Sequence, residues 1–196
     1  MEYFYGIVED RQDPLKVGRV RVRIHGIHTD DKLLIASADL PWCQVILPTT
    51  SAGLSGLGTG HGLVEGSTVF GYFRDGEQCQ EPCVIGSIPG IPIEKPTGEF
   101  GFADPNAKYP IVPNESDVNR LARNDFTRLS LVARQDNVKK GIATADFNST
   151  TNAKGGEITA SDGDVWNQPA PAWAAVYPFN HIYESESGHY SEIDDT

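Results

Sequence analysis

The sequence predicts a mainly β protein whose first half is a small closed barrel. The chain of 196 residues contains 20 glycines and 13 prolines, which suits short strands and turns better than long helices. Residues 18–24 alternate between basic and β-branched apolar side chains, the pattern of a half-buried strand. Its apolar face would hold Val20, Val22 and Ile24. Its polar face would hold Arg19, Arg21 and Arg23.

The first strand of the barrel is expected just before this one. Phe4–Val8 is a short apolar run, and Asp13–Lys16 separates it from the alternating strand. Pro14 presets φ for a bend, and the Asp13 carboxylate can accept hydrogen bonds from backbone groups of the same turn. The chain therefore opens with a predicted β-hairpin.

Three further strands follow within the first ninety residues. They are expected in the segments Leu40–Pro48, Thr68–Phe73 and Pro82–Ile88. Residues 27–38 read as a loop with a short helical turn, and Asp75-Gly76 should supply positive φ in a tight turn. Trp42 is a candidate core or interface anchor. Five short strands, with a long loop between the third and fourth, favour an OB-type barrel over residues 1–95.

The character of the sequence changes after residue 95. Residues 96–140 read as an exit segment, with a short helix expected within 118–133 after the N-cap candidates of 114–117. Residues 141–176 are rich in small and polar residues, and we expect an extended linker there. Residues 177–196 form a separate C-terminal segment.

Charge and composition limit the function classes. The net charge is −11, and residues 155–196 contain eight acids but no Lys or Arg, which disfavours non-specific binding to nucleic acid. No apolar run approaches the roughly 18 residues of a membrane-spanning helix. The N-terminus lacks the basic and apolar regions of a secretory signal, so we expect synthesis in a cytoplasm.

Candidate chemical motifs are weak. The glycine-rich loop 51–62 leads into a predicted strand, whereas phosphate-binding loops lead into a helix. The pair Cys79 and Cys83 has no second ligand pair at zinc-binding spacing. The pairs His25/His28 and His189/Glu192 are spaced i, i+3, which places the two side chains on opposite faces of a strand. We therefore assign no catalytic, cofactor-binding or metal-binding residue and expect no enzymatic activity.

Several stretches of this sequence carry a family resemblance. They are Val8-Glu9-Asp10-Arg11, Asp13-Pro14-Leu15-Lys16, Gly18–Arg23, Leu40-Pro41-Trp42, Thr50-Ser51-Ala52, Val64-Glu65-Gly66 and Glu94-Lys95-Pro96, with Glu186-Ser187-Gly188-His189, Glu192 and Asp194-Asp195-Thr196 near the end. Together they resemble the N-terminal OB domain of the central spike protein of contractile bacteriophage tails, and its entry into a triple-stranded β-helix. The likeness covers about 1–105 and 177–196. The valine-glycine repeat spike proteins of type VI secretion carry a segment similar to residues 177–196.

The resemblance implies a homotrimer in the tail baseplate of a virion, with residues 177–196 at the start of an intertwined trimeric β-stem. The implied partners are a ring-shaped hub protein, a spike-tip protein, a tape-measure protein and, during infection, the host outer membrane. About 70 residues separate Pro105 from Tyr177, too few for the lysozyme domain that some members carry there. The expected function is therefore structural, connecting the hub to the membrane-piercing needle.

Interface residues for this function are chosen partly from the arginine strand and partly from the C-terminal segment. The candidates are Arg19, Arg21, Arg23, Trp42, Phe179, Ile182, Tyr183, Gly188, His189, Tyr190 and Ile193. Two alternatives remain open. One is a nucleic-acid-binding OB module, in which the arginines contact phosphates while Trp42, Tyr72 and Phe73 stack on bases. The other is a spike component of type VI secretion.

Overall fold

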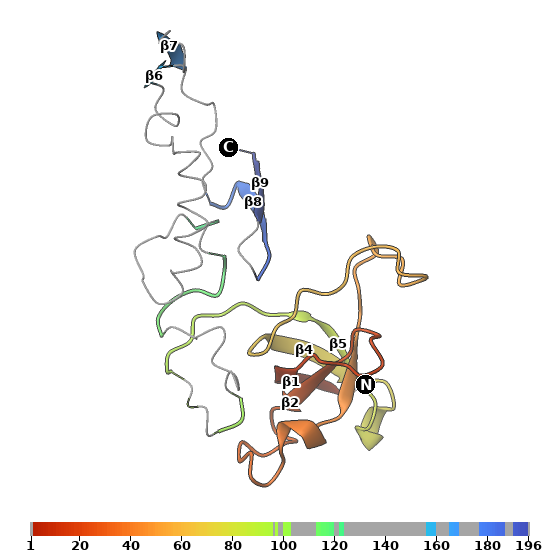
Figure 1. Ribbon diagram of the computed structural model, residues 1–196. Coiled ribbons are helices and arrows are strands. Elements are labelled where there is room, and N and C mark those ends of the chain that lie inside the picture. The colour runs from red at the N-terminus through yellow and green to blue at the C-terminus, as the bar shows by residue number, and fades with distance from the viewer. Residues whose placement is uncertain are drawn as a thin grey trace. The chain divides into compact units, whose positions relative to one another are not determined.

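The computed structural model describes residues 2–95, 97, 100–102, 113–119, 122–123, 156–159, 165–168, 177–186 and 190–195. The chain divides into two compact units, residues 1–116 and 117–196 (Figure 1). Within these described ranges, the first unit contains five strands and the second contains four. None of the described helices is long and apolar enough to cross a membrane.

The first unit is built on a closed five-stranded barrel. Its strands are β1 (Tyr3–Asp10), β2 (Val20–Ile24), β3 (Trp42–Val45), β4 (Thr68–Phe73) and β5 (Pro82–Ser87). They close in the order β1-β2-β3-β5-β4. The β3–β5 pair is parallel, and the other four pairs are antiparallel. The predicted OB-type barrel is confirmed, and so is the opening hairpin.

The alternation of β2 fills the interior of the barrel. Val20, Val22 and Ile24 are fully buried and pack with residues from the other four strands. The core cluster comprises Phe4, Val8, Val20, Val22, Ile24, Cys43, Leu63, Val69, Phe73 and Val84. Trp42 is only partly buried and does not belong to this cluster. Its neighbour Cys43 points inward instead, because successive side chains of β3 alternate between the two faces.

A close approach of backbones at β4 makes the barrel compact. A Cβ at Gly71 would collide with the Phe4 ring and with the Cys83 carbonyl oxygen. The absent side chain lets Phe4 fill the barrel interior between β1 and β4, against Phe73 at 5.1 Å between ring centroids.

The β4–β5 connection differs in detail from the prediction. Gly76 has a φ of +65°, as expected, but Asp75 has a φ of −90° and does not contribute positive φ. The turn is longer than a tight hairpin and contains the 3-10 helix η2 (Gly76–Gln78). The Asp75 carboxylate accepts hydrogen bonds from the backbone N–H groups of Gln80 and Glu81, which stabilises this wider turn. The short helical turn expected within 27–38 corresponds to η1 (Ser37–Asp39).

The described residues of the second unit form two β-hairpins. Strands β6 (Gly156–Thr159) and β7 (Val165–Gln168) pair antiparallel, as do β8 (Asn180–Glu184) and β9 (Tyr190–Asp194). The β6–β7 hairpin falls within 141–176, so the extended-linker prediction is wrong for those eight residues. The other residues of that range lie outside the described part of the chain, as does most of the helix expected within 118–133. The boundaries at 95, 140 and 176 remain predictions.

Candidate interaction surfaces

The β2–β3 loop is fastened to the barrel by a buried ion pair. The Arg23 guanidinium donates from Nε and Nη2 to the two carboxylate oxygens of Glu9, at 2.6 and 3.1 Å, and both side chains are 0% exposed. The same guanidinium donates to the backbone carbonyls of Thr29 and Ile35, and Ser37 Oγ donates to Glu9. Two buried charges are thus paired and hydrogen-bonded on several sides. The arrangement holds the loop against the outer face of β1 and β2.

The sequence predicts Arg23 on the polar, outward face of its strand as an interface candidate. The side chain does point outward, but it is 0% exposed because the β2–β3 loop and Gly101 cover it. Its two neighbours on the same face, Arg19 and Arg21, remain partly exposed. Of the three arginines on this face, Arg19 and Arg21 are the two that are exposed enough to contact another molecule.

Arg19 and Arg21 surround the ring of Trp42. Their guanidinium carbons lie 5.4 and 4.5 Å from the ring centroid, within cation–π range. Arg21 also donates to the Ser37 carbonyl oxygen, and its guanidinium lies 3.8 Å from the Asp10 carboxylate. The structure therefore brings three predicted site residues together, and the ring and both guanidinium groups are already engaged within the protomer.

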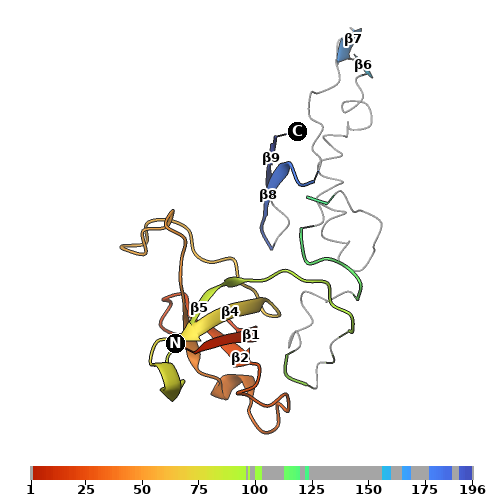
Figure 2. The same cartoon turned by 180° about the vertical axis from the view of Figure 1, so that it is seen from behind.

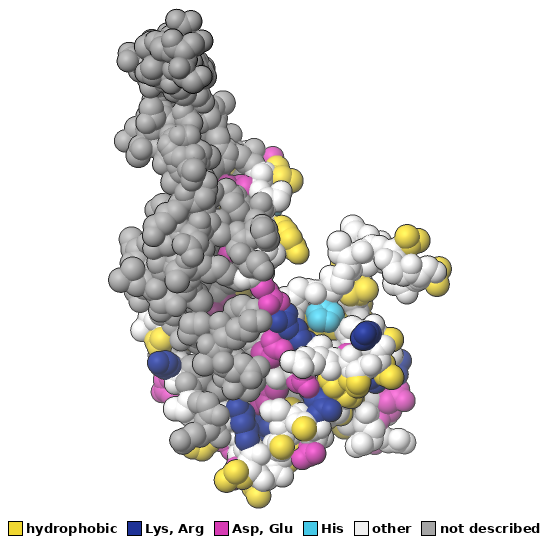
Figure 3. All heavy atoms as spheres, viewed as in Figure 1, with side chains coloured by type: hydrophobic (Ala, Val, Ile, Leu, Met, Phe, Trp, Pro, Cys, Tyr) yellow, Lys and Arg dark blue, Asp and Glu magenta, His cyan; other side chains and the backbone are white. Residues whose placement is uncertain are grey.

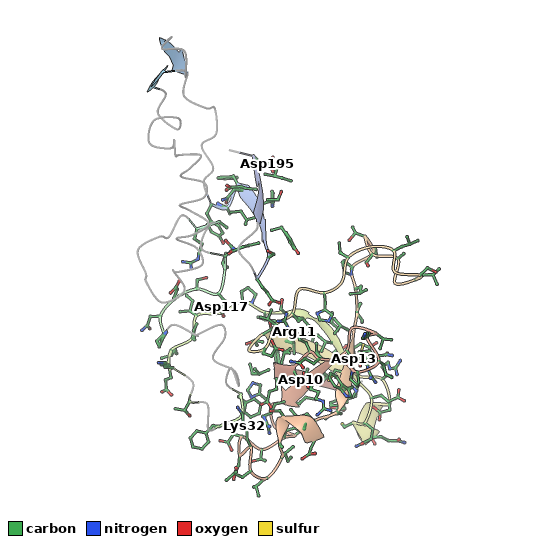
Figure 4. The ribbon with its side chains drawn as sticks, viewed as in Figure 1. Asp10, Arg11, Asp13, Lys32, Asp117 and Asp195 are labelled. Atoms are coloured by element: carbon green, nitrogen blue, oxygen red, sulfur yellow. The ribbon has the colours of Figure 1, made fainter. Side chains whose placement is uncertain are left out.

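The β1–β2 turn supplies the carboxylate that binds Arg19. Asp13 accepts hydrogen bonds from the backbone N–H groups of Leu15, Val17 and Arg19. It also forms an ion pair with the Arg19 side chain, with 2.7 Å between Arg19 Nη2 and Asp13 Oδ1. The Arg19 side chain, followed by these backbone donors, holds the pKa of Asp13 well below its usual range. Asp10, Arg11 and Asp13 are labelled on this part of the barrel in Figure 4. The carboxylates of Asp10 and Asp13 balance the positive charges of Arg21 and Arg19 on this face.

The outer face of β1 and β4 carries an aromatic strip, defined as Tyr3, Tyr5 and Phe70. Tyr3 and Phe70 are stacked with ring centroids 5.6 Å apart, and Tyr5 lies 5.1 Å from Phe70. Of the three residues predicted to stack on bases, Phe73 is buried in the core and Trp42 lies against Arg19 and Arg21. Tyr72 pairs with Tyr3 and shares the outer face of the strip. Alternation along β1 and the register of β4 could have indicated this strip. It is an exposed apolar surface on the barrel.

The β8–β9 hairpin has two unlike faces. On one face, the Asn180 side chain donates to the Ala122 carbonyl oxygen and to Glu192, and Glu184 accepts from Asn119. On the other face, Tyr183 and Ile193 are 73% and 61% exposed. Tyr183 and Ile193 thus give this second face an exposed apolar part.

The remaining C-terminal candidates are placed unevenly. Phe179 precedes β8 and is exposed, whereas Ile182 is partly buried. Tyr190 begins β9, but its side chain lies outside the described atoms, and Gly188 and His189 lie outside the described residues. These residues and those of the arginine strand belong to different units.

Histidines and cysteines form no metal-binding group among the residues that the structure describes. His28 Nδ1 accepts the Ile24 backbone N–H, and His25 stacks on Phe102 with centroids 4.0 Å apart. Burial lowers the pKa of both histidines. The thiols of the three cysteines are free. These side chains serve local packing and hydrogen bonding.

Comparison with known proteins decides the family. Residues 24–169 match the model of the Gp5 N-terminal OB domain. The chain belongs to the Gp5 N-terminal OB domain family. It is 39% identical to Protein Gp5 of Vibrio phage KVP40, over all of this chain and 51% of that protein. It is 46% identical to the pre-baseplate central spike protein Gp5 of Enterobacteria phage T4, over 56% of this chain and 20% of that protein.

The chain thus spans about half the length of one of these Gp5 relatives and a fifth of the other. The family match begins at the end of β2, and it includes β3, β4 and β5. It also covers β6 and β7, in the range where the sequence pattern indicated only a linker. The β8–β9 hairpin lies beyond it.

Proposed function

We propose that this chain is a structural part of a phage tail baseplate, contributing the N-terminal OB barrel of a trimeric central spike. The single observation that carries the proposal is membership of the Gp5 family, since the T4 relative is named a pre-baseplate central spike protein. Both relatives come from phages, which favours a phage baseplate over a type VI secretion spike. The site of action is the tail of the virion.

The exposed surfaces are consistent with a role in assembly. Large apolar side chains are solvent-exposed on the barrel and on the β8–β9 hairpin, and exposed apolar patches commonly mark protein–protein contacts. The exposed face of β8–β9, with Tyr183 and Ile193, would pack around the threefold axis of a homotrimer at the start of a β-stem. Phe179, Gly188 and His189 are further members of this proposed contact. Ile182 and Tyr190 occupy strand positions of the opposite face and remain interface candidates there.

The further partners in this proposal are a ring-shaped baseplate hub protein, a spike-tip protein, a tape-measure protein and the host outer membrane during infection. We propose a structural and not a catalytic role for the chain. The arginine face favours this over nucleic-acid binding, because Arg19, Arg21 and Arg23 are each paired with an acid of the same protomer. A phosphate at Arg19 or Arg23 would have to displace a carboxylate that is hydrogen-bonded to the guanidinium.

The location and copy number can be measured directly. Purified tails from the source that encodes the chain would be digested, and peptides from residues 1–116 quantified against isotope-labelled standards. The proposal predicts three copies per tail. Absence of these peptides from tails that contain the other baseplate proteins would contradict it, and six copies would contradict the trimer.

The proposed C-terminal contact has its own test. Replacing Tyr183 and Ile193 with Ser should shift the trimer to monomers in sedimentation equilibrium. A matched variant with Ser at the exposed barrel residues Leu15 and Val17 should leave the trimer intact. Equal behaviour of the two variants would remove the β8–β9 face from the proposed interface.

A further inference from the structure

The loop between β3 and β4 forms an arm that stands away from the barrel. We call residues 51–62 the glycine-rich arm. Both ribbon views show it projecting into solvent, and the space-filling view shows hydrophobic side chains at its end (Figures 1, 2 and 3). Those side chains include Leu54 and Leu57, which are 70% and 65% exposed. An apolar tip on a projecting arm is a candidate contact with another molecule.

The arm is ordered by bonds within itself. Leu54 and Leu57 form an isolated antiparallel bridge, and the Leu57 N–H donates to the Leu54 carbonyl oxygen at 3.0 Å. At its base, Ser51 Oγ donates to the Thr59 carbonyl oxygen at 2.8 Å. Gly58 has a φ of +101°, and a Cβ there would collide with the Ser51 side chain and backbone. The arm therefore holds its two leucines in place before a partner arrives, which lowers the entropy cost of binding.

The arm is also free of charge. Residues 46–64 contain no Asp, Glu, Lys or Arg, although the whole chain carries a net charge of −11. Copies of such an acidic chain repel one another, and a contact made by acidic segments would add to that repulsion. An uncharged arm with an apolar tip can approach a second copy without this penalty. The charge distribution therefore favours another copy of the same chain as the occupant.

We propose that each glycine-rich arm packs its Leu54–Leu57 tip against the aromatic strip of Tyr3, Tyr5 and Phe70 on the neighbouring copy's barrel. This inference rests on the proposed trimer and adds a contact outside the C-terminal segment. In a threefold assembly each interface joins two different surfaces of the same protein, so one arm per protomer closes the ring.

The test measures the association of the whole 196-residue chain by sedimentation equilibrium. The arm variant carries Leu54→Ser and Leu57→Ser. Its control carries Leu15→Ser and Val17→Ser, because those side chains are 67% and 68% exposed on the same unit but outside the arm. Loss of two buried leucines per interface should raise the protomer concentration at half-dissociation by at least about tenfold. The control should shift it by less than about twofold, and circular dichroism should show that both variants keep the barrel.

A second measurement identifies the contact. A photoreactive benzoylphenylalanine at position 57 should crosslink to another copy in the wild-type background, at a peptide found by mass spectrometry. Gly58→Ala should weaken both association and crosslinking, since it distorts the base of the arm without changing either leucine. The inference would be overturned if position 57 crosslinks only to a different protein and a purified trimer gives no crosslink between copies.

The outcomes separate this inference from the proposed function. A trimer that the arm variant leaves unchanged would overturn the arm contact and leave the trimeric spike standing. Dimers or larger oligomers that the arm variant dissociates would keep the arm contact and contradict the trimer. A wild-type chain that stays monomeric at 100-fold dilution and at the highest soluble concentration would overturn both.

Discussion

The buried pair between Glu9 and Arg23 makes a sharp prediction about stability. Replacing Glu9 with Ala leaves a guanidinium with 0% exposure and no carboxylate partner. Removing one partner of a buried ion pair costs about 3–5 kcal/mol, because the remaining charge stays desolvated. The exposed pair between Arg74 and Glu81 provides a matched control, with side chains 46% and 55% exposed. Replacing Arg74 with Ala should cost about 0–1 kcal/mol.

The measurement is equilibrium unfolding in urea, followed by fluorescence, with the free energy of unfolding compared among variants. The double variant Glu9→Leu/Arg23→Met removes both charges and keeps the volume filled. It should be more stable than Glu9→Ala, because no unpaired charge remains, although the carbonyls of Thr29 and Ile35 lose a donor. If Glu9→Ala and Arg74→Ala cost the same, or if the double variant is the least stable of the three, the reasoning is refuted.

Three further predictions concern the barrel. Gly71→Ala should destabilise the protein by about 1–3 kcal/mol in the same urea assay, since its Cβ collides with an aromatic ring and a backbone carbonyl. Gly86→Ala should cost less, because a Cβ there would meet nothing within 4 Å. Equal losses of stability in the two variants would contradict the packing described. The pKa of Asp13 is lowered in the folded state, so its contribution to stability is fully present above the unfolded-state pKa of about 4 and is lost progressively as pH falls from there toward the lower folded-state pKa. The difference in urea midpoint between wild type and Asp13→Asn should therefore be constant above about pH 5 and shrink as pH falls below about 4. A difference that does not shrink below about pH 4 would contradict this role. Burial raises the pKa of the Cys43 thiol to about 12. At pH 8 this thiol should therefore react with a thiol reagent only after unfolding, while the less buried Cys79 reacts in the native state. Equal reaction rates of the two thiols in the native state would contradict the burial of Cys43.

Local patterns predicted the strands well because each strand of the barrel has one face toward the interior and one face toward the outside. Thr68–Phe73 was predicted with the bounds of β4, and the alternation of β2 gave its buried face correctly. Because the interior face must be apolar, apolar residues recur at every second position of a strand, and this alternation is visible in the sequence.

The placement of polar residues depended on contacts between distant segments. Arg23 looks like Arg19 and Arg21 in the sequence, but the β2–β3 loop folds over it and Glu9 pairs with it from another strand. No local pattern specifies that cover. The β6–β7 hairpin was missed for a related reason, since its two four-residue strands lie in a segment with little apolar periodicity. The exposed leucines of the glycine-rich arm were missed because composition indicates a loop but not what the loop presents.

The mass of the native particle in solution distinguishes a trimeric spike from a monomeric protein. Size exclusion coupled to light scattering would be run on the 196-residue chain at micromolar concentration. The trimeric spike account predicts a mass near three times the 21.3 kDa of one chain. A stable mass of one chain, unchanged over a hundredfold range of concentration, would contradict it.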